Sequence, residues 1–173
     1  MRALEFWKAV TVDRANLLES LVSLLEENQI RYCVIGGQGV NAYADPLVSL
    51  DLDLVVALDQ LETAEALLRR HFKVERFPYS INVSLPDSNL RVQLQTDPRY
   101  FEFVARASTR EILGLILPVA QVEDVLQGKI WAALDPARRG TKQKKDLLDI
   151  ARLLEGYPQL RSRVPAAILE KLL

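Results

Sequence analysis

The stretch "CVIGGQGVNAYADPLVSLDLDLVV", residues 33–56, contains two features that decide the fold. Glycines occupy three of the four positions 36–39, and Asp51 and Asp53 lie two residues apart in an apolar run. On a strand, residues i and i+2 project from the same face, roughly 6–7 Å apart. Two carboxylates buried together would repel each other and one would be pushed to protonate, so the pair requires a positive or hydrated neighbour.

A divalent cation between the aspartates meets this requirement. Mg²⁺ is the expected ion, because it prefers oxygen ligands and is commonly shared with substrate phosphates. Gly36 and Gly37 end the preceding strand where a helix is expected to begin, so backbone N–H groups can approach a phosphate closely. Taken singly, the glycines also fit an ordinary turn, and the aspartates fit a solvated edge or a capping pair. Residues 38–50 leave room for a short helix and a loop, which lets both features return to one sheet edge.

Composition indicates one domain, or one domain with a small appendage. The 173 residues are 49% hydrophobic, enough to bury a core. With 22 basic against 23 acidic residues, no overall field attracts nucleic acid or an anionic membrane. The single cysteine, Cys33, excludes an intramolecular disulfide and a cysteine zinc site; it suits a cytoplasmic protein and is expected to be buried. No signal peptide and no membrane span are predicted.

Hydrophobic periodicity predicts an α+β chain that opens with a helix and closes with a helical segment. The division is expected near residue 120, giving an α/β core at 1–119 and a C-terminal helical segment at 120–173 packed on it. Asp59 is the expected N-cap of the helix after the second strand. The run 111–119 is expected to form one strand that stops at Pro118. The expected helices are 13–28, 38–44, 59–72, 121–134, 146–156 and 165–173, and the other expected strands are 31–37, 51–58, 73–77, 79–85 and 90–96.

Gly36-Gly37 followed by "SLDLDLVV" resembles the nucleotidyltransferase superfamily with the polymerase-β-like fold. The longer match "IGGQGVNAYADPLVSLDLDL" is similar to its small stand-alone branch, related to minimal nucleotidyltransferases and AbiEii-type toxins. The resemblance implies a mixed β-sheet flanked by helices. It also implies that Gly36 and Gly37 contact a nucleoside triphosphate, while Asp51 and Asp53 hold Mg²⁺ or Mn²⁺ and catalyse nucleotidyl transfer to a hydroxyl. The other candidate nucleotide contacts here are Gln38 and Ser49.

A second resemblance covers "VEDVLQGKIWAALDPARRGTKQKKDLLDIARLL", residues 122–154. It is similar to the closing segment of the AbiEii-like branch, where a lysine on one helix precedes a Lys-Asp-x-x-Asp stretch on the next. The matching residues are Lys129, Lys145, Asp146 and Asp149. Lys129 falls on an apolar helical stripe, so it needs a partner. Two interpretations stay open: a snorkelling or salt-bridged structural lysine, or a catalytic cation facing substrate phosphate. Lys145 is a candidate nucleotide contact.

The connection between these two helices is strongly basic. Five cations fall within eight residues, and the plain interpretation is a solvated loop. Such a cluster also attracts an RNA acceptor or a triphosphate tail, but no aromatic residue is interleaved to stack bases. The five are Arg138, Arg139, Lys142, Lys144 and Lys145.

The third metal carboxylate that the family normally supplies is missing. Its expected position falls on Gln93, whose amide oxygen can bind a metal but cannot take a proton. Asp97 shares that face but lies ~13 Å further along the strand. Leu47 stands where related sequences often carry arginine. These departures weaken the case for catalysis more than the case for the fold.

Two functions therefore remain. The first is transfer of a nucleotide from NTP–Mg²⁺ to RNA, protein or a small molecule, with a toxin role and an antitoxin partner implied by the resemblance. The second is a catalytically impaired member that serves as a nucleotide-binding or interaction module. A plain structural domain requires the glycines, the aspartates and Lys129 to coincide by chance.

Overall fold

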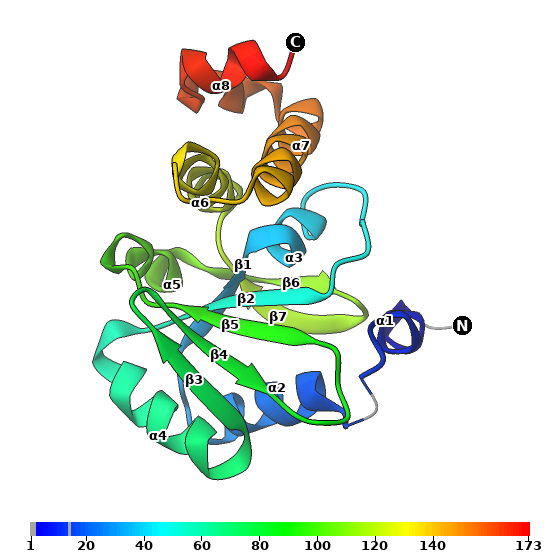
Figure 1. The fold of residues 1–173 in the computed structure, drawn as a ribbon, viewed down its shortest axis with the longest axis vertical. Coiled ribbons are helices and arrows are strands. Elements are labelled where there is room, and N and C mark those ends of the chain that lie inside the picture. The colour runs from blue at the N-terminus through cyan, green and yellow to red at the C-terminus, as the bar shows by residue number, and fades with distance from the viewer. Residues whose placement is uncertain (1–2, 14) are drawn as a thin grey trace.

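Figure 1 shows the computed structural model, which describes residues 3–13 and 15–173. A mixed sheet forms the centre of the molecule, with helices on both of its faces. The strands are β1 Tyr32–Ile35, β2 Asp51–Val56, β3 Lys73–Phe77, β4 Ser80–Ser84, β5 Arg91–Gln95, β6 Ser108–Ile112 and β7 Leu115–Val119. The helices are α1 Ala3–Thr11, α2 Leu17–Glu27, α3 Gly36–Asn41, α4 Leu61–His71, α5 Glu102–Arg106, α6 Val122–Leu134, α7 Gly140–Gly156 and α8 Ala166–Lys171.

The seven strands follow the order β3-β4-β5-β2-β1-β7-β6. β2 is central, antiparallel to β1 and parallel to β5. This register sets Asp53 opposite Ile35 on one side and Gln93 on the other. The end of β1, the start of α3 and the aspartates of β2 therefore meet at one place.

Strand alternation divides the core into two clusters, as the sequence predicts. Leu52, Leu54 and Val56 of β2 face the cluster that α2 and α4 cover, whereas Val55 faces a second cluster. The second cluster includes buried residues of α6, α7 and α8. Figure 1 shows α2 and α4 below the sheet, with α3, α6, α7 and α8 above it. The C-terminal helices thus share a core with β2, the strand that carries Asp53.

The apolar stripe predicted on the first C-terminal helix is confirmed. Cys33 is likewise buried, and burial raises the pKa of its thiol to about 12, which is consistent with the expected hydrophobic role. The six buried stripe residues of α6 are Val122, Val125, Leu126, Lys129, Ile130 and Ala133.

Four local predictions are wrong. Asp59 does not cap α4; it lies in the 3₁₀ turn Leu58–Gln60 (η1) and pairs with Arg31 at 2.6 Å, and Gln60 occupies the cap position. The run 111–119 does not form a single strand. Leu113 and Gly114 adopt φ of 57° and 82°, so the chain turns back between β6 and β7.

Pro118 does not end its strand, because it lies inside β7. β7 pairs with β1 only at Val119, so there is no long β1–β7 hydrogen-bond ladder that would require an N–H at Pro118. The basic connection is also shorter than expected, since α7 already begins at Gly140. Among the described residues, no helix is both long and apolar enough to cross a bilayer.

Candidate active site

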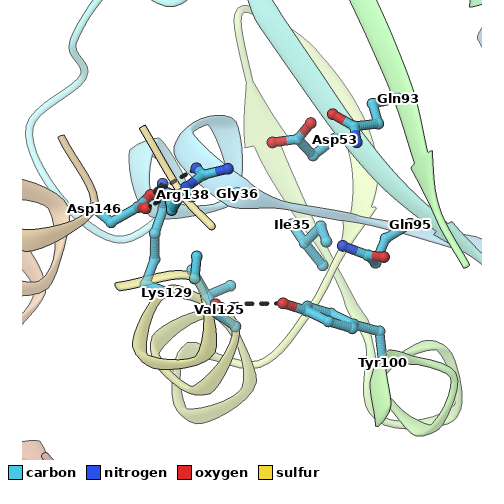
Figure 2. A pocket seen from close by; sticks show the side chains of 12 residues that line it. Ile35, Gly36, Asp53, Gln93, Gln95, Tyr100, Val125, Lys129, Arg138 and Asp146 are labelled. Carbon is cyan, nitrogen blue, oxygen red and sulfur yellow. Dashed lines mark hydrogen bonds and ion pairs between the residues drawn. The ribbon is translucent and has the colours of Figure 1, made fainter. Parts of the chain in front are cut away.

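The structure brings Gly36 and Asp53 together in a small pocket between β1, β2, β5 and α6. Figure 2 shows Asp53 beside Gln93 at one wall, with Lys129, Arg138 and Asp146 grouped at another. Gly36 has φ of +66°, and a Cβ built there would lie 2.2 Å from Asp53 Oδ2. The close approach of backbone to carboxylate therefore requires glycine at this position.

Asp53 is the carboxylate most in need of a cation. Burial raises the pKa of the Asp53 carboxyl; the charge of Lys129 opposes this shift, and that of Asp51 adds to it. Across residues 3–13 and 15–173, its carboxylate forms no hydrogen bond or ion pair with another side chain. A positive ligand entering the pocket would stabilise the ionised form.

Asp51, in contrast, already has cationic neighbours. Arg91 Nε lies 2.7 Å from Asp51 Oδ1, and Lys142 Nζ lies 3.3 Å from Asp51 Oδ2. The side chain of Arg91 is 61% exposed, so this pair contributes little stability and leaves the carboxylate open to exchange its partner. An incoming metal ion would compete with these two cations at Asp51.

The position predicted for the third carboxylate holds an amide, as the strand register shows. Gln93 lies opposite Asp53 in the β2–β5 pair and lines the same pocket. Asp97 does not replace it, because its carboxylate accepts hydrogen bonds from Arg99 and caps the 3₁₀ turn Pro98–Tyr100 (η2). Those hydrogen bonds hold the pKa of Asp97 below its ordinary value.

Lys129 belongs to a buried ion-pair network that connects α6 and α7. Its Nζ lies 3.1 Å from Asp146 Oδ1 and 2.8 Å from Asp149 Oδ2. Arg138 and Arg152 hold the outer oxygens of the two acids, at 2.7 and 2.8 Å. Burial acts to lower the pKa of Lys129, but the two carboxylates outweigh it and the net shift is upward. Lys129 therefore stays charged, with both neighbouring acids as partners.

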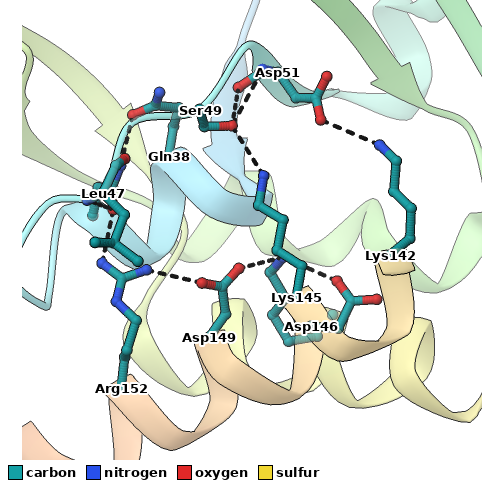
Figure 3. Close-up of polar contacts among 12 residues, drawn as sticks. Gln38, Leu47, Ser49, Asp51, Lys142, Lys145, Asp146, Asp149 and Arg152 are labelled. Atoms are coloured by element: carbon teal, nitrogen blue, oxygen red, sulfur yellow. Dashed lines mark hydrogen bonds and ion pairs between the residues drawn. The ribbon is translucent and has the colours of Figure 1, made fainter. Parts of the chain in front are cut away.

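Lys145 and Ser49 meet on the other side of Asp51. Figure 3 shows Lys145 Nζ pointing to Ser49 Oγ, with the atoms 3.4 Å apart. A Cβ on Gly37 would lie 3.7 Å from the same hydroxyl, so the second glycine faces this group across ordinary contact distance. The candidate nucleotide contacts Gly37, Ser49 and Lys145 thus lie next to one another, with Ser49 buried between the other two.

Gln38 is the one candidate that lies apart from the others. Its side chain is buried and lines a different pocket, with Phe6, Trp7 and Leu47. Its Oε1 accepts a hydrogen bond from Asn41 Nδ2 at 3.1 Å. The structure does not bring this residue to the Asp53 pocket.

Sequence reasoning missed Arg91 and Tyr100, and it did not place Arg138 and Lys142 at the aspartates. Arg91 and Lys142 contact Asp51, while Arg138 and Tyr100 line the Asp53 pocket. The sequence leaves the basic cluster as a solvated loop or as an attractor of RNA or a triphosphate tail. In the structure Arg138 pairs with Asp146 of α7, Lys142 pairs with Asp51 and Lys145 donates to Ser49. The sequence signal of this cluster is five cations within eight residues, with no acid among them.

The residues present fit one divalent ion better than two. Asp53 and the Gln93 amide line this pocket and supply hard oxygen ligands, whereas Asp51 lines a neighbouring pocket that shares Gln93. The unpartnered Asp53 carboxylate provides the electrostatic demand. Among the described residues, no cluster of three or more His, Cys, Asp or Glu side chains has metal-binding geometry. The pocket holds about 90 Å³, room for an ion and a few waters.

Replacing Asp53 with asparagine is expected to stabilise the metal-free protein at neutral pH. A gain of ~1 kcal/mol in the free energy of unfolding would raise Tm by roughly 2–4 °C. The pKa of the Asp53 carboxyl is higher in the folded than in the unfolded protein. Ionisation of this carboxyl therefore destabilises the fold fully at a pH above the folded pKa. The cost disappears as the pH falls to the unfolded pKa. The gain in the variant should therefore vanish in acid. Thermal unfolding between pH 4 and 8 measures it, with Asp59→Asn as the exposed control. A gain that does not depend on pH contradicts the electrostatic origin.

No protein-family model matches the sequence, and no curated protein sequence matches it. The fold is nevertheless found in solved structures. The crystal structure of ANT(2'')-Ia in complex with adenylyl-2''-tobramycin matches with a TM-score of 0.62 and 15% identity, over 91% of this chain and 97% of that chain. Lincomycin-bound LnuA, a lincosamide antibiotic adenylyltransferase, matches with a TM-score of 0.56 and 12% identity, over 83% and 99%.

An antigenic nucleotidyltransferase-like protein from Paracoccidioides brasiliensis matches with a TM-score of 0.51 and 22% identity, over 86% of this chain and 75% of that chain. At these identities the likeness concerns the fold. The chain has the polymerase-β-like nucleotidyltransferase fold with C-terminal helices, as the resemblance in sequence predicts. None of these matches supports the narrower AbiEii-type branch.

Proposed function

We propose that this protein is a nucleotidyltransferase that binds a nucleoside triphosphate together with Mg²⁺ or Mn²⁺. The observation that carries the proposal is the contact between the Gly36 backbone and the unpartnered Asp53 carboxylate in one pocket. The missing Cβ lets the Asp53 carboxylate lie against the Gly36 backbone, and this carboxylate attracts the ion that phosphate oxygens share. LnuA, named an adenylyltransferase, and ANT(2'')-Ia, in complex with adenylyl-2''-tobramycin, support the same class of reaction.

The roles of the side chains follow from their positions. Asp53 and Asp51 would hold the ion, with Gln93 as a neutral oxygen ligand. When bound, the ion stabilises charge that develops on the transferring phosphoryl group. Lys145 and Ser49, beside Gly37, would hold the outer phosphates. Lys129 would orient Asp146 and Asp149 instead of contacting substrate directly.

Calorimetric titration of ATP, CTP, GTP and UTP with Mg²⁺ tests the binding step. We expect one of them to bind, and Asp53→Ala to weaken that binding at least roughly tenfold through loss of a metal ligand. Asp59→Ala, which removes an exposed acid paired with Arg31, is the matched control and should leave affinity unchanged. Absence of heat with all four nucleotides, or equal affinity in the Asp53 variant, would refute the proposal.

A second function, nucleotide binding without transfer, is favoured by one observation. Gln93 faces Asp53 where the family's third carboxylate is expected, and it cannot accept a proton from an acceptor hydroxyl. Incorporation of labelled nucleotide into total RNA and cell lysate separates the two functions. Transfer that depends on Asp53 excludes the non-catalytic function, and Gln93→Asp should then raise the rate. Nucleotide binding without transfer, in the wild-type protein and in the Gln93→Asp variant alike, favours the second function.

We propose a small molecule as acceptor, ahead of RNA or protein. A larger pocket of about 840 Å³ adjoins the Asp53 pocket and shares Gln95, Tyr100, Ala132 and Arg138 with it. This volume suits a small ligand. The neighbours' names include a tobramycin adduct and lincomycin, which are ligands of this kind. The AbiEii-type toxin role and an antitoxin partner stay predictions from sequence resemblance.

A further inference from the structure

A second pocket, here named the Gln38 pocket, lies at the junction of α1, α3, the loop 46–48 and the β6–β7 turn. It has a volume of about 420 Å³, and none of its lining residues lines the Asp53 pocket. Phe6, Leu47 and Val48 form apolar walls and are 50%, 48% and 54% exposed. The pocket is therefore open to solvent and mostly apolar, as small-molecule sites commonly are.

One buried polar group lies in this apolar lining. The side chain of Gln38 is 0% exposed, and its Nε2 has no hydrogen-bond partner within the part of the chain that the structure describes. A buried donor without an acceptor is unfavourable, and a native protein seldom retains one without a reason. Figure 3 shows Gln38 beside Leu47 and Ser49, with no contact drawn to its amide nitrogen.

The orientation of the Gln38 amide is fixed by its neighbour Asn41. Leu47 N donates to Asn41 Oδ1 at 3.0 Å, and Asn41 Nδ2 donates to Leu47 O at 2.8 Å. Arg152 also donates to Asn41 Oδ1, at 2.9 Å. Asn41 must therefore present its remaining N–H to Gln38, whose Oε1 accepts it. A flipped Gln38 would set two amide nitrogens against each other, so the donor without a partner is Nε2.

We propose that the Gln38 pocket binds a small apolar molecule carrying a carbonyl or similar acceptor oxygen. Because Gln38 Nε2 is fully buried, the ligand oxygen would displace a wall side chain to accept its hydrogen bond. The apolar body would pack against Phe6, Leu47 and Val48. The volume limits the ligand to small-molecule size. This site is separate from the proposed nucleotide site, and its existence does not depend on nucleotidyl transfer.

A pair of ligands that differ only in the acceptor tests the proposal on the 173-residue protein. The probes are 4-fluoroacetophenone and 1-ethyl-4-fluorobenzene, followed by ¹⁹F NMR titration. We expect the ketone to bind roughly fivefold more tightly, the effect of one additional neutral hydrogen bond. Gln38→Met keeps the side-chain length and removes the amide, so it should abolish the preference while hydrocarbon affinity stays within about twofold.

Location is tested by Leu47→Glu, which adds charge to the apolar wall and should weaken both probes. Leu58→Glu, at an exposed leucine that does not line the pocket, is the control and should change neither. If Gln38→Met does not fold, the proposal is still tested by the preference of the wild-type protein for the ketone and by the Leu47 and Leu58 variants. Equal binding of the probes, or a preference that survives Gln38→Met, overturns the proposal. The proposal is also overturned if the protein self-associates and Leu47→Glu abolishes this association, because a second copy of the chain would then cover the pocket.

Discussion

Replacing Lys129 with methionine is expected to lower the free energy of unfolding by about 3 kcal/mol, the scale for breaking a buried ion pair. The ammonium is shared between Asp146 and Asp149, both almost fully buried, at 3.1 and 2.8 Å. After the change each acid keeps only one cation, Arg138 or Arg152. Thermal unfolding should show Tm falling by roughly 6–12 °C for a chain of this length.

The companion variants separate lost charge from lost packing. Lys171→Met, at an exposed lysine near the C-terminus, should be neutral within about 0.5 kcal/mol. Adding Asp149→Asn to Lys129→Met should recover part of the loss, because it removes one of the two carboxylates that have lost a cation. Unchanged stability in Lys129→Met, or a double variant that simply adds the two losses, contradicts the network.

The central strands were predictable because their sequence pattern is periodic. Alternation in "DLDLVV" placed Leu52 and Leu54 against one face, and the structure confirms that division. The apolar stripe around Lys129 predicted a buried lysine that needs a partner, and both suggested acids turn out to be its partners. Local periodicity was sufficient for these features, because each depends on neighbours within one strand or one helix.

The partners of Asp51 were not predictable in the same way. Arg91 reaches it because β5 lies parallel to β2 in a register that pairs these two residues. Lys142 reaches it from the first turn of α7, across a long separation in sequence. Such contacts depend on the order of the strands and the placement of the helices. Neither can be predicted from local patterns in a single sequence. The orientation of Gln38 away from the aspartates has the same origin.

The β6–β7 turn was missed although its glycine was visible. "EILGLILPV" predicts one strand because its apolar residues run almost without a break. Gly114 takes the left-handed conformation, and Leu113 does so as well, which is uncommon for a leucine. A single glycine inside an apolar run does not distinguish a bulge from a turn. The pairing of Ile112 with Leu115 settles it here.

Replacing Gly36 with alanine is expected to abolish metal-dependent stabilisation and to lower the free energy of unfolding. Left-handed backbone costs alanine about 1–2 kcal/mol, and the new Cβ would meet Asp53 Oδ2 at 2.2 Å. The carboxylate must then move from the position proposed for the ion. Thermal unfolding with and without Mn²⁺ and a non-hydrolysable triphosphate measures both effects.

Gly37→Ala is the matched control for the Gly36 variant. Its Cβ would have 3.7 Å to the nearest atom, and Gly37 does not have positive φ, so stability should change by less than about 0.5 kcal/mol. Combining Gly36→Ala with Asp53→Ala removes the carboxylate oxygen from the clash and should recover part of the loss. The backbone cost and a tight 3.0 Å approach to the Cβ of residue 53 remain. A Gly36 variant that unfolds like the Gly37 variant, and still gains stability from Mn²⁺, would show that the glycine and the carboxylate do not form one site. The proposed ion would then have to bind elsewhere, because the Gly36–Asp53 contact is what places the phosphate and the metal ligand within reach of each other.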